Sequence, residues 1–139
     1  MPMVTSLKIV QAAALTLAIC LSGGSDAHTT AATQPVFSDG AHFQQKTGEA
    51  IFHSVCQACH MPSGGGAIGA GSFPALAKNS RLAAAAYPTY VVLHGKNGMP
   101  SFADLLDDDQ VSAVVGYVRD HLGNNFTDQV TADQVHKLR

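Results

Sequence analysis

The sequence predicts an all-helical domain with long loops. Apolar residues recur at helical spacing in several stretches, and no stretch alternates apolar and polar residues as a half-buried strand does. The composition agrees with a globular domain, since 46% of the 139 residues are hydrophobic and only 13% are charged. A chain of this length can build one domain with a modest core.

The N-terminal segment has the pattern of an export signal. Lys8 precedes an almost wholly apolar run over residues 9–21, and small residues follow that run. The run is short for a bilayer span, so we expect a secretory signal peptide at 1–27 rather than a retained membrane anchor. A flexible leader over 28–40 and a folded domain over 41–139 would then lie in a bacterial periplasm. Membrane association is expected only if the segment is retained or through a complex.

The first half of the domain predicts two helices and two loops. A helix is expected near residues 47–58, where apolar residues recur every three or four positions. A glycine-rich loop follows over 64–72. The next helix is short and ends near His94, with Pro88 in its first turn. Gly98 and Pro100 then predict a loop over 97–102.

The clearest helix begins after Asp107. Gln110 lies three residues later, which is the spacing of a capping box. Gly123 can supply the C-terminal stop, and Thr131 with Gln134 predicts the start of a last short helix. One apolar stripe follows the long helix: Val111, Val114, Val115, Val118 and Leu122.

The main chemical signal is Cys56-Gln57-Ala58-Cys59-His60, a C-x-x-C-H run. Two thiols at this spacing can form thioether bonds with one porphyrin edge, and the adjacent His60 can then bind the iron. A zinc site would need a second pair of ligands, and a thioredoxin-like pair would need a preceding strand. A simple disulfide remains open, because an exported protein meets an oxidising compartment.

Met99 is the expected second axial ligand. It lies in a Gly98-Met99-Pro100 loop 39 residues after His60, whereas Met61 is too close to His60 to reach the opposite face of the ring. His94 is the rival ligand and would give a bis-histidine iron. Near Pro74, a backbone carbonyl can accept a hydrogen bond from the other nitrogen of His60.

The remaining charged and glycine-rich patterns point to no second chemistry. The G-x-G-x-x-G match at 64–69 follows no strand and opens no helix, so it does not indicate a dinucleotide site. The net charge is −2 with no basic stripe, which argues against a nucleic-acid partner. Lys78, Arg81 and Lys96 flank the ligand loops and could steer an acidic partner, although a solvated role is favoured.

These residues, in this order, make the chain similar to the class I cytochrome c family. The resemblance implies a small cytochrome c-like domain whose N- and C-terminal helices cross and whose loops wrap one covalently bound haem c. Gly48, Phe52 and Tyr117 look like the residues of that crossing. The matching patterns are Gly48-x3-Phe52-x3-Cys56-x2-Cys59-His60, Pro74-x-Leu76, Gly95-x2-Gly98-Met99-Pro100-x-Phe102 and Val114-Val115-x-Tyr117-Val118-Arg119. Met61 departs from the pattern, since many members have Gly there.

The function expected from these residues is electron transfer and not catalysis, because no substrate-activating acid, base or nucleophile is apparent. The donor would be a dehydrogenase or respiratory complex and the acceptor an oxidase. The segment over 123–139 is loosely similar to cytochrome subunits of bacterial periplasmic dehydrogenases. Two alternatives stay open: a haem-based sensor or peroxidase-like protein with a labile Met99, and a thiol-disulfide protein without haem.

Overall fold

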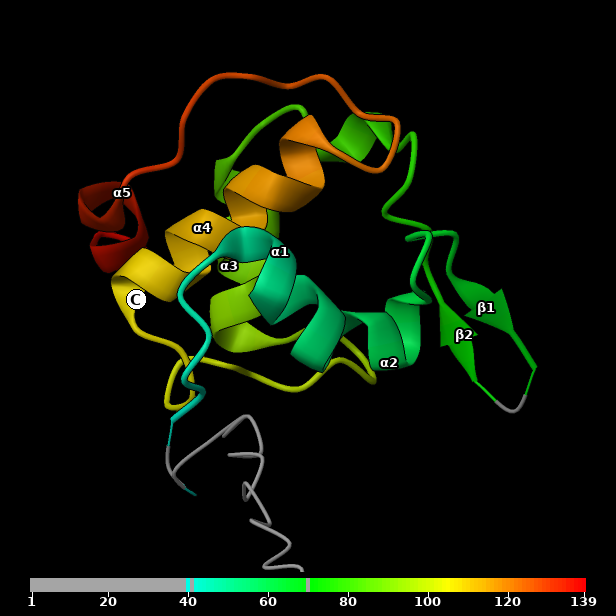
Figure 1. Cartoon of the computed structure of the whole chain (residues 1–139), viewed down its shortest axis with the longest axis horizontal. Helices are drawn as coiled ribbons and strands as arrows, with labels where there is room; N and C mark the ends of the chain where they lie inside the picture. The colour runs from blue at the N-terminus through cyan, green and yellow to red at the C-terminus, as the bar shows by residue number, and fades with distance from the viewer. Residues whose placement is uncertain (1–39, 41, 70) are drawn as a thin grey trace, which may run out of the picture. The chain divides into compact units, whose positions relative to one another are not determined.

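The computed structural model describes residues 40, 42–69 and 71–139. The predicted signal at 1–27 lies outside the described residues, as does the predicted leader at 28–40 apart from Gly40. In the described part no helix is long and apolar enough to cross a membrane. The elements are, in chain order, α1 (Gly48–Ile51), the π-helical η1 (Phe52–Cys56), α2 (Gln57–His60), β1 (Ala67–Ile68), β2 (Ser72–Phe73), the 3-10 helix η2 (Ser80–Leu82), α3 (Ala86–His94), α4 (Asp108–Asp120) and α5 (Ala132–His136) (Figure 1).

The first three elements form one continuous helical segment from 48 to 60, where a helix was predicted over 47–58. Thr47 caps its start, because its hydroxyl oxygen accepts a hydrogen bond from the Ala50 N–H at 3.2 Å. The middle of the segment widens to a π-helical turn, in which the Gln57 N–H donates to the Phe52 carbonyl. Turns of this kind are rare and occur frequently at functional sites. Here the turn ends at the first cysteine of the motif.

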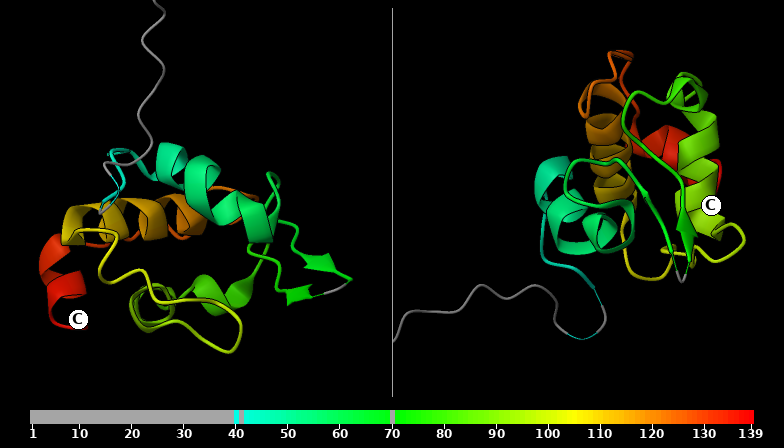
Figure 2. Two further views of the ribbon diagram at one scale, coloured as in Figure 1. Left: turned by 90° about the horizontal axis from the view of Figure 1, so that it is seen from below. Right: turned by 90° about the vertical axis from the view of Figure 1, so that its right-hand side faces the viewer.

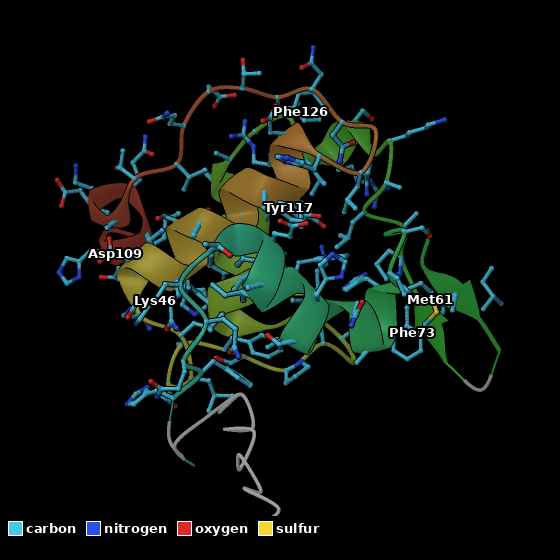
Figure 3. All side chains as sticks on the ribbon, viewed as in Figure 1. Lys46, Met61, Phe73, Asp109, Tyr117 and Phe126 are labelled. Carbon is cyan, nitrogen blue, oxygen red and sulfur yellow. The ribbon has the colours of Figure 1, made fainter. Side chains whose placement is uncertain are left out.

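Helix α4 crosses this first segment (Figures 1 and 2). Gly48 lies at the point of closest approach, where a Cβ atom would stand 2.6 Å from Tyr117 Cβ and closer still to the Ala113 carbonyl oxygen. The rings of Phe52 and Tyr117 follow, with centroids 5.6 Å apart. Figure 3 labels Tyr117, which belongs to α4. The predicted crossing and its three residues are therefore confirmed.

The core lies where the helices meet. The predicted capping box at Asp107 with Gln110 is present, and the predicted last helix also begins with one, at Thr131 with Gln134. Leu122 of the predicted stripe is only half-buried, because α4 ends at Asp120 and the chain turns sharply there. The buried hydrophobic residues are Ile51, Phe52, Leu82, Leu93, Leu106, Val111, Val114, Val115, Val118 and Val135.

A small antiparallel hairpin, β1 with β2, stands within the glycine-rich loop, where the sequence predicted no strand (Figure 2). Each strand has two residues, which is too short for an alternating pattern to be recognised. The described part of the chain is otherwise helical or looped. The hairpin therefore adds to the predicted all-helical fold without changing its architecture.

Arg119 is fully buried at the end of α4 and ties two loops to that helix. Its guanidinium donates to the carbonyls of Leu82 (2.9 Å) and Ala83 (2.9 Å), just before α3. It also donates to the backbone carbonyl of Asp128 (2.6 Å) and to its carboxylate (2.5 Å). The hydrogen bond from Arg119 lowers the pKa of the Asp128 carboxyl. A buried guanidinium needs such partners, so both loops are held close to α4.

The crossing yields a prediction at Gly48. Gly48→Ala should lower the free energy of unfolding by roughly 2–3 kcal/mol, because the added methyl group overlaps the backbone of α4. Gly116→Ala is the matched control on α4, since a Cβ atom there meets nothing within 4 Å. Alanine in that open helical position should raise the stability by about 1 kcal/mol. Denaturant unfolding followed by circular dichroism measures both. Equal effects of the two substitutions would contradict a close crossing at Gly48.

Candidate functional site

The C-x-x-C-H residues lie at the end of the first helical segment. Cys56 is half-buried, Cys59 is exposed, and both are free thiols. Residues three apart share one face of a helix, so the two sulfur atoms belong to the same side of the segment. His60 is the last residue of α2 and is only 8% exposed. The disulfide left open by the spacing is not present in this structure.

The electrostatics of Cys56 argue against thiol-disulfide exchange. Burial, and then the neighbouring Cys59 thiol, raise the pKa of Cys56 to about 11. Redox-active cysteines have a lowered pKa, because the thiolate is the nucleophile. Among the described residues, no three or more His, Cys, Asp or Glu side chains are grouped so that they could hold a metal ion.

His60 has a defined tautomer. Its Nδ1 lies 2.9 Å from the backbone carbonyl oxygen of Pro74. A carbonyl can only accept a hydrogen bond, so Nδ1 carries a proton, and in a neutral imidazole Nε2 then presents the lone pair. Nε2 has no hydrogen-bond partner among the described residues. This is the state that a metal-binding histidine requires, with its ring oriented by a backbone acceptor.

The Pro74 carbonyl is held in place by the glycine-rich loop. Gly66 has a positive φ of 68°, and a Cβ atom there would stand 2.7 Å from the Ala75 nitrogen. Its N–H donates to the His60 carbonyl at 3.0 Å. The Gly64 carbonyl accepts from the N–H of Leu76 at 2.7 Å. The glycines thus bring the segment after β2 against the end of the motif helix.

Met99 lies in a tight turn that directly follows α3 in the chain, and its side chain is half-buried. Lys96 and Met99 exchange two backbone hydrogen bonds of 3.0 Å, and Asn97 between them has a φ of 54°. Gly95 has a φ of 72°, and a Cβ atom there would stand 2.5 Å from the Met99 carbonyl oxygen. The turn therefore folds back tightly on the end of α3.

Two further hydrogen bonds join the chain after Met99 to α3. The Ser101 hydroxyl donates to the Leu93 carbonyl at 2.5 Å, and the Phe102 N–H donates to the Val92 carbonyl at 3.0 Å. Both acceptors lie in the last turn of the helix, where carbonyls have no partner within the helix itself. The loop and the helix end thereby satisfy one another's backbone groups.

His94, the rival ligand, makes a hydrogen bond to a distant part of the chain. Its Nε2 donates to the Leu138 carbonyl at 2.8 Å, and its ring contacts Tyr90 with centroids 4.3 Å apart. The side chain is exposed.

Two of the three basic residues noted in the sequence line a hollow beside the Met99 turn. A cavity of about 340 Å³ is lined by Arg81, Tyr87 and Lys96. The Lys96 ammonium lies 5.2 Å from the centre of the Tyr87 ring, within the range of a cation–π interaction. Lys78 is also exposed. A steering role for these residues stays a prediction.

The donor set fits a c-type haem. Two free thiols share one side of a helix end, and a histidine with an available Nε2 follows directly. Met99 is half-buried, and its thioether is of a type that haem iron accepts as a ligand.

Comparison with known proteins leads in the same direction. The family model described as "Cytochrome C oxidase, cbb3-type, subunit III" matches residues 43–118, more than half of the chain. Cytochrome c6 of Synechococcus elongatus is 39% identical over 83 residues, which cover 57% of this chain and 92% of that protein. The chain belongs to the cytochrome c family.

As a family member, this cytochrome is a monohaem electron-transfer protein with one covalently bound haem c. Cytochrome c6 of Thermosynechococcus vestitus is also 39% identical, over 57% of this chain and 71% of that protein. The crystal structure of cytochrome c6C from Synechococcus sp. PCC 7002 is 26% identical with a TM-score of 0.46, over 55% of this chain and 94% of that one.

Asn124 helps to build the site but carries no recognisable sequence signal. Asn124 accepts a hydrogen bond from the Asn79 N–H (2.8 Å) and donates to the carbonyls of Leu76 (2.9 Å) and Val118 (2.7 Å). It therefore fastens the segment after Pro74 to α4. A lone Asn in a polar loop is too common to predict such a role. Gly95, by contrast, follows a helical pattern directly, and a glycine there is a known stop signal.

Met61, the departure noted in the sequence, yields a prediction. Its φ of 65° and ψ of 155° lie in a region that only glycine adopts without strain. Met61→Gly should raise the free energy of unfolding by about 1 kcal/mol, the relieved strain less the greater entropy of an unfolded glycine. Met61→Ala is the control, because it removes the side chain and keeps the strained backbone. Thermal unfolding measures both. A gain for alanine as large as that for glycine would contradict the strain.

Proposed function

We propose that Cys56 and Cys59 attach the haem through thioether bonds and that His60 and Met99 are its axial ligands. The observation that carries the proposal is the hydrogen bond from His60 Nδ1 to the Pro74 carbonyl, which leaves Nε2 available for iron. When bound, the haem supplies a one-electron ferric–ferrous couple. The residues around it bind and orient it.

The chain's own contribution is to keep both ligands in place in either oxidation state. Pro74 fixes the His60 ring through a backbone atom, which cannot change rotamer. Gly95 and the paired backbone of Lys96 and Met99 shape the turn that presents the Met99 sulfur. A site whose ligands move little between the two states needs little reorganisation when an electron arrives or leaves.

Water exclusion is the second contribution. Ile51, Phe52 and Leu93 are 0% exposed, and they lie in the two helical segments from which the motif and the Met99 turn extend. An apolar surround raises the reduction potential, because it disfavours the more highly charged ferric state. A thioether ligand acts in the same direction. We therefore expect a carrier of relatively high potential.

The ligand assignment is tested by Met99→Ala. Substitution should abolish the long-wavelength sulfur-to-iron absorption band of the ferric protein and lower the reduction potential, since a thioether favours the ferrous state. Optical spectra and a redox titration measure both. An unchanged six-coordinate spectrum would remove Met99 from the iron. Met61→Ala is the matched control and should keep the band.

Carbon monoxide separates electron transfer from the alternative of a ligand sensor with a labile Met99. The turn that carries Met99 is fixed by four backbone or side-chain hydrogen bonds to α3 and within itself, which favours a closed iron. Reduced protein should bind carbon monoxide slowly and incompletely, and Met99→Ala should bind it fast and fully. Rapid, complete binding by the unsubstituted protein would overturn the closed carrier.

We further propose an exported carrier in a bacterial periplasm, with a dehydrogenase or respiratory complex as donor and an oxidase as acceptor. The apolar run over residues 9–21 supports export. The matched family's description as an oxidase subunit supports an oxidase as acceptor. The loose similarity of 123–139 to dehydrogenase subunits supports the donor.

The test of location and acceptor uses protein purified from the periplasmic fraction. Its mass should equal that of residues 28–139 plus one haem, because the signal is removed on export. Ferrous protein should then be oxidised by aerobic membranes of the same bacterium, and cyanide should block this oxidation. Oxidation no faster than in buffer would contradict an oxidase acceptor, and a full-length mass would contradict cleavage.

A further inference from the structure

The chain between α3 and α4, residues 95–107, is here called the Met99 loop. The segment from 131 to 139, here called the clamp segment, contacts the chain at both ends of this loop. It packs against α4 through Val135, which is fully buried. Its backbone carbonyl at Leu138 accepts the hydrogen bond from His94 Nε2, at the residue where α3 ends and the Met99 loop begins. The segment lies beyond residues 43–118, which the family model matches.

Arg139 reaches the other end of the same loop. Its guanidinium donates to the carbonyls of Ala103 and Leu106, the second at 3.0 Å. These carbonyls belong to the chain between Met99 and α4, and helical hydrogen bonds cannot satisfy them because the helix begins only at Asp108. The clamp segment therefore contacts the chain on both sides of Met99, at His94 before it and at Ala103 and Leu106 after it.

The guanidinium is itself held in position. Arg139 pairs with the Asp108 carboxylate at 2.7 Å, and His136 Nδ1 lies 3.1 Å from the other oxygen of that carboxylate. The Arg139 side chain is 28% exposed and the Asp108 side chain is 25% exposed, so solvent screens this pair only partly. Charge-assisted hydrogen bonds of this kind are stronger than neutral ones.

We propose that the clamp segment holds the Met99 loop closed over the iron, with Arg139 and His94 as positioning residues. The inference rests on the proposed function, in which Met99 is a ligand. A ligand loop opens when its restraints are weakened, and an outside ligand then competes for the iron in proportion to the open fraction. Release of the clamp should therefore appear as tighter binding of an added ligand.

The experiment is an imidazole titration of the ferric haem protein, followed by loss of the sulfur-to-iron band. Arg139→Gln should bind imidazole roughly tenfold more tightly, the size expected for losing a charge-assisted hydrogen bond. Arg139→Lys should restore part of the difference, because one ammonium cannot span two carbonyls and a carboxylate. Lys137→Gln is the control, since the exposed Lys137 side chain makes no hydrogen bond within the described chain, and should match the unsubstituted protein.

His94→Phe provides the second variant, because it keeps a ring against Tyr90 and removes only the donor to Leu138. It should also tighten imidazole binding, and it decides the question if Arg139→Gln does not fold. Unchanged affinity in His94→Phe and Arg139→Gln, in a protein that shows the band, would overturn the clamp. Failure of the ligand assignment has another signature: Met99→Ala would bind imidazole no more tightly than the unsubstituted protein.

Discussion

The close crossing at Gly48 is the constraint on which the rest of the structure depends. The motif lies at the far end of a helical segment that runs from 48 to 60 without a break. Because the backbone of this segment meets the backbone of α4 at Gly48, its direction is set at one end, and the position of His60 at the other end follows. The rings of Phe52 and Tyr117 then contact one another across the two helices. No larger residue at position 48 would allow the same geometry.

Backbone carbonyls accept the hydrogen bonds that orient His60 and that fasten the Met99 turn to α3. Pro74 orients His60 through its carbonyl, and the end of α3 receives the Ser101 hydroxyl and the Phe102 N–H in the same way. Such acceptors are insensitive to rotamer changes, and they become available where helices end or where glycines let two backbones approach. Gly66 and Gly95 supply that approach on either side of the site.

The helices and the motif could be predicted because their signals are local. The capping box at Asp107, the apolar stripe of α4 and the C-x-x-C-H spacing each lie within about a dozen residues. The hairpin and the contacts of Asn124 could not, because the strands are too short to show a pattern and the partners of Asn124 are distant in the sequence. His94 shows the same limit: only the structure reveals that its nitrogen is engaged by Leu138.

Two arginines fix α3 from opposite ends. Arg119, buried at the end of α4, binds the carbonyls of Leu82 and Ala83 just before α3. Arg139, beside the start of α4, binds carbonyls of the loop that follows α3. Since α4 is also the helix that Gly48 contacts, it meets the motif helix. Through Arg119 and the pairing of Asp108 with Arg139, it is also joined to the chain before and after α3, and Met99 lies in the second of these segments. The two proposed ligands, His60 and Met99, are therefore both positioned relative to α4. This suits a site whose iron must change charge without changing its ligands.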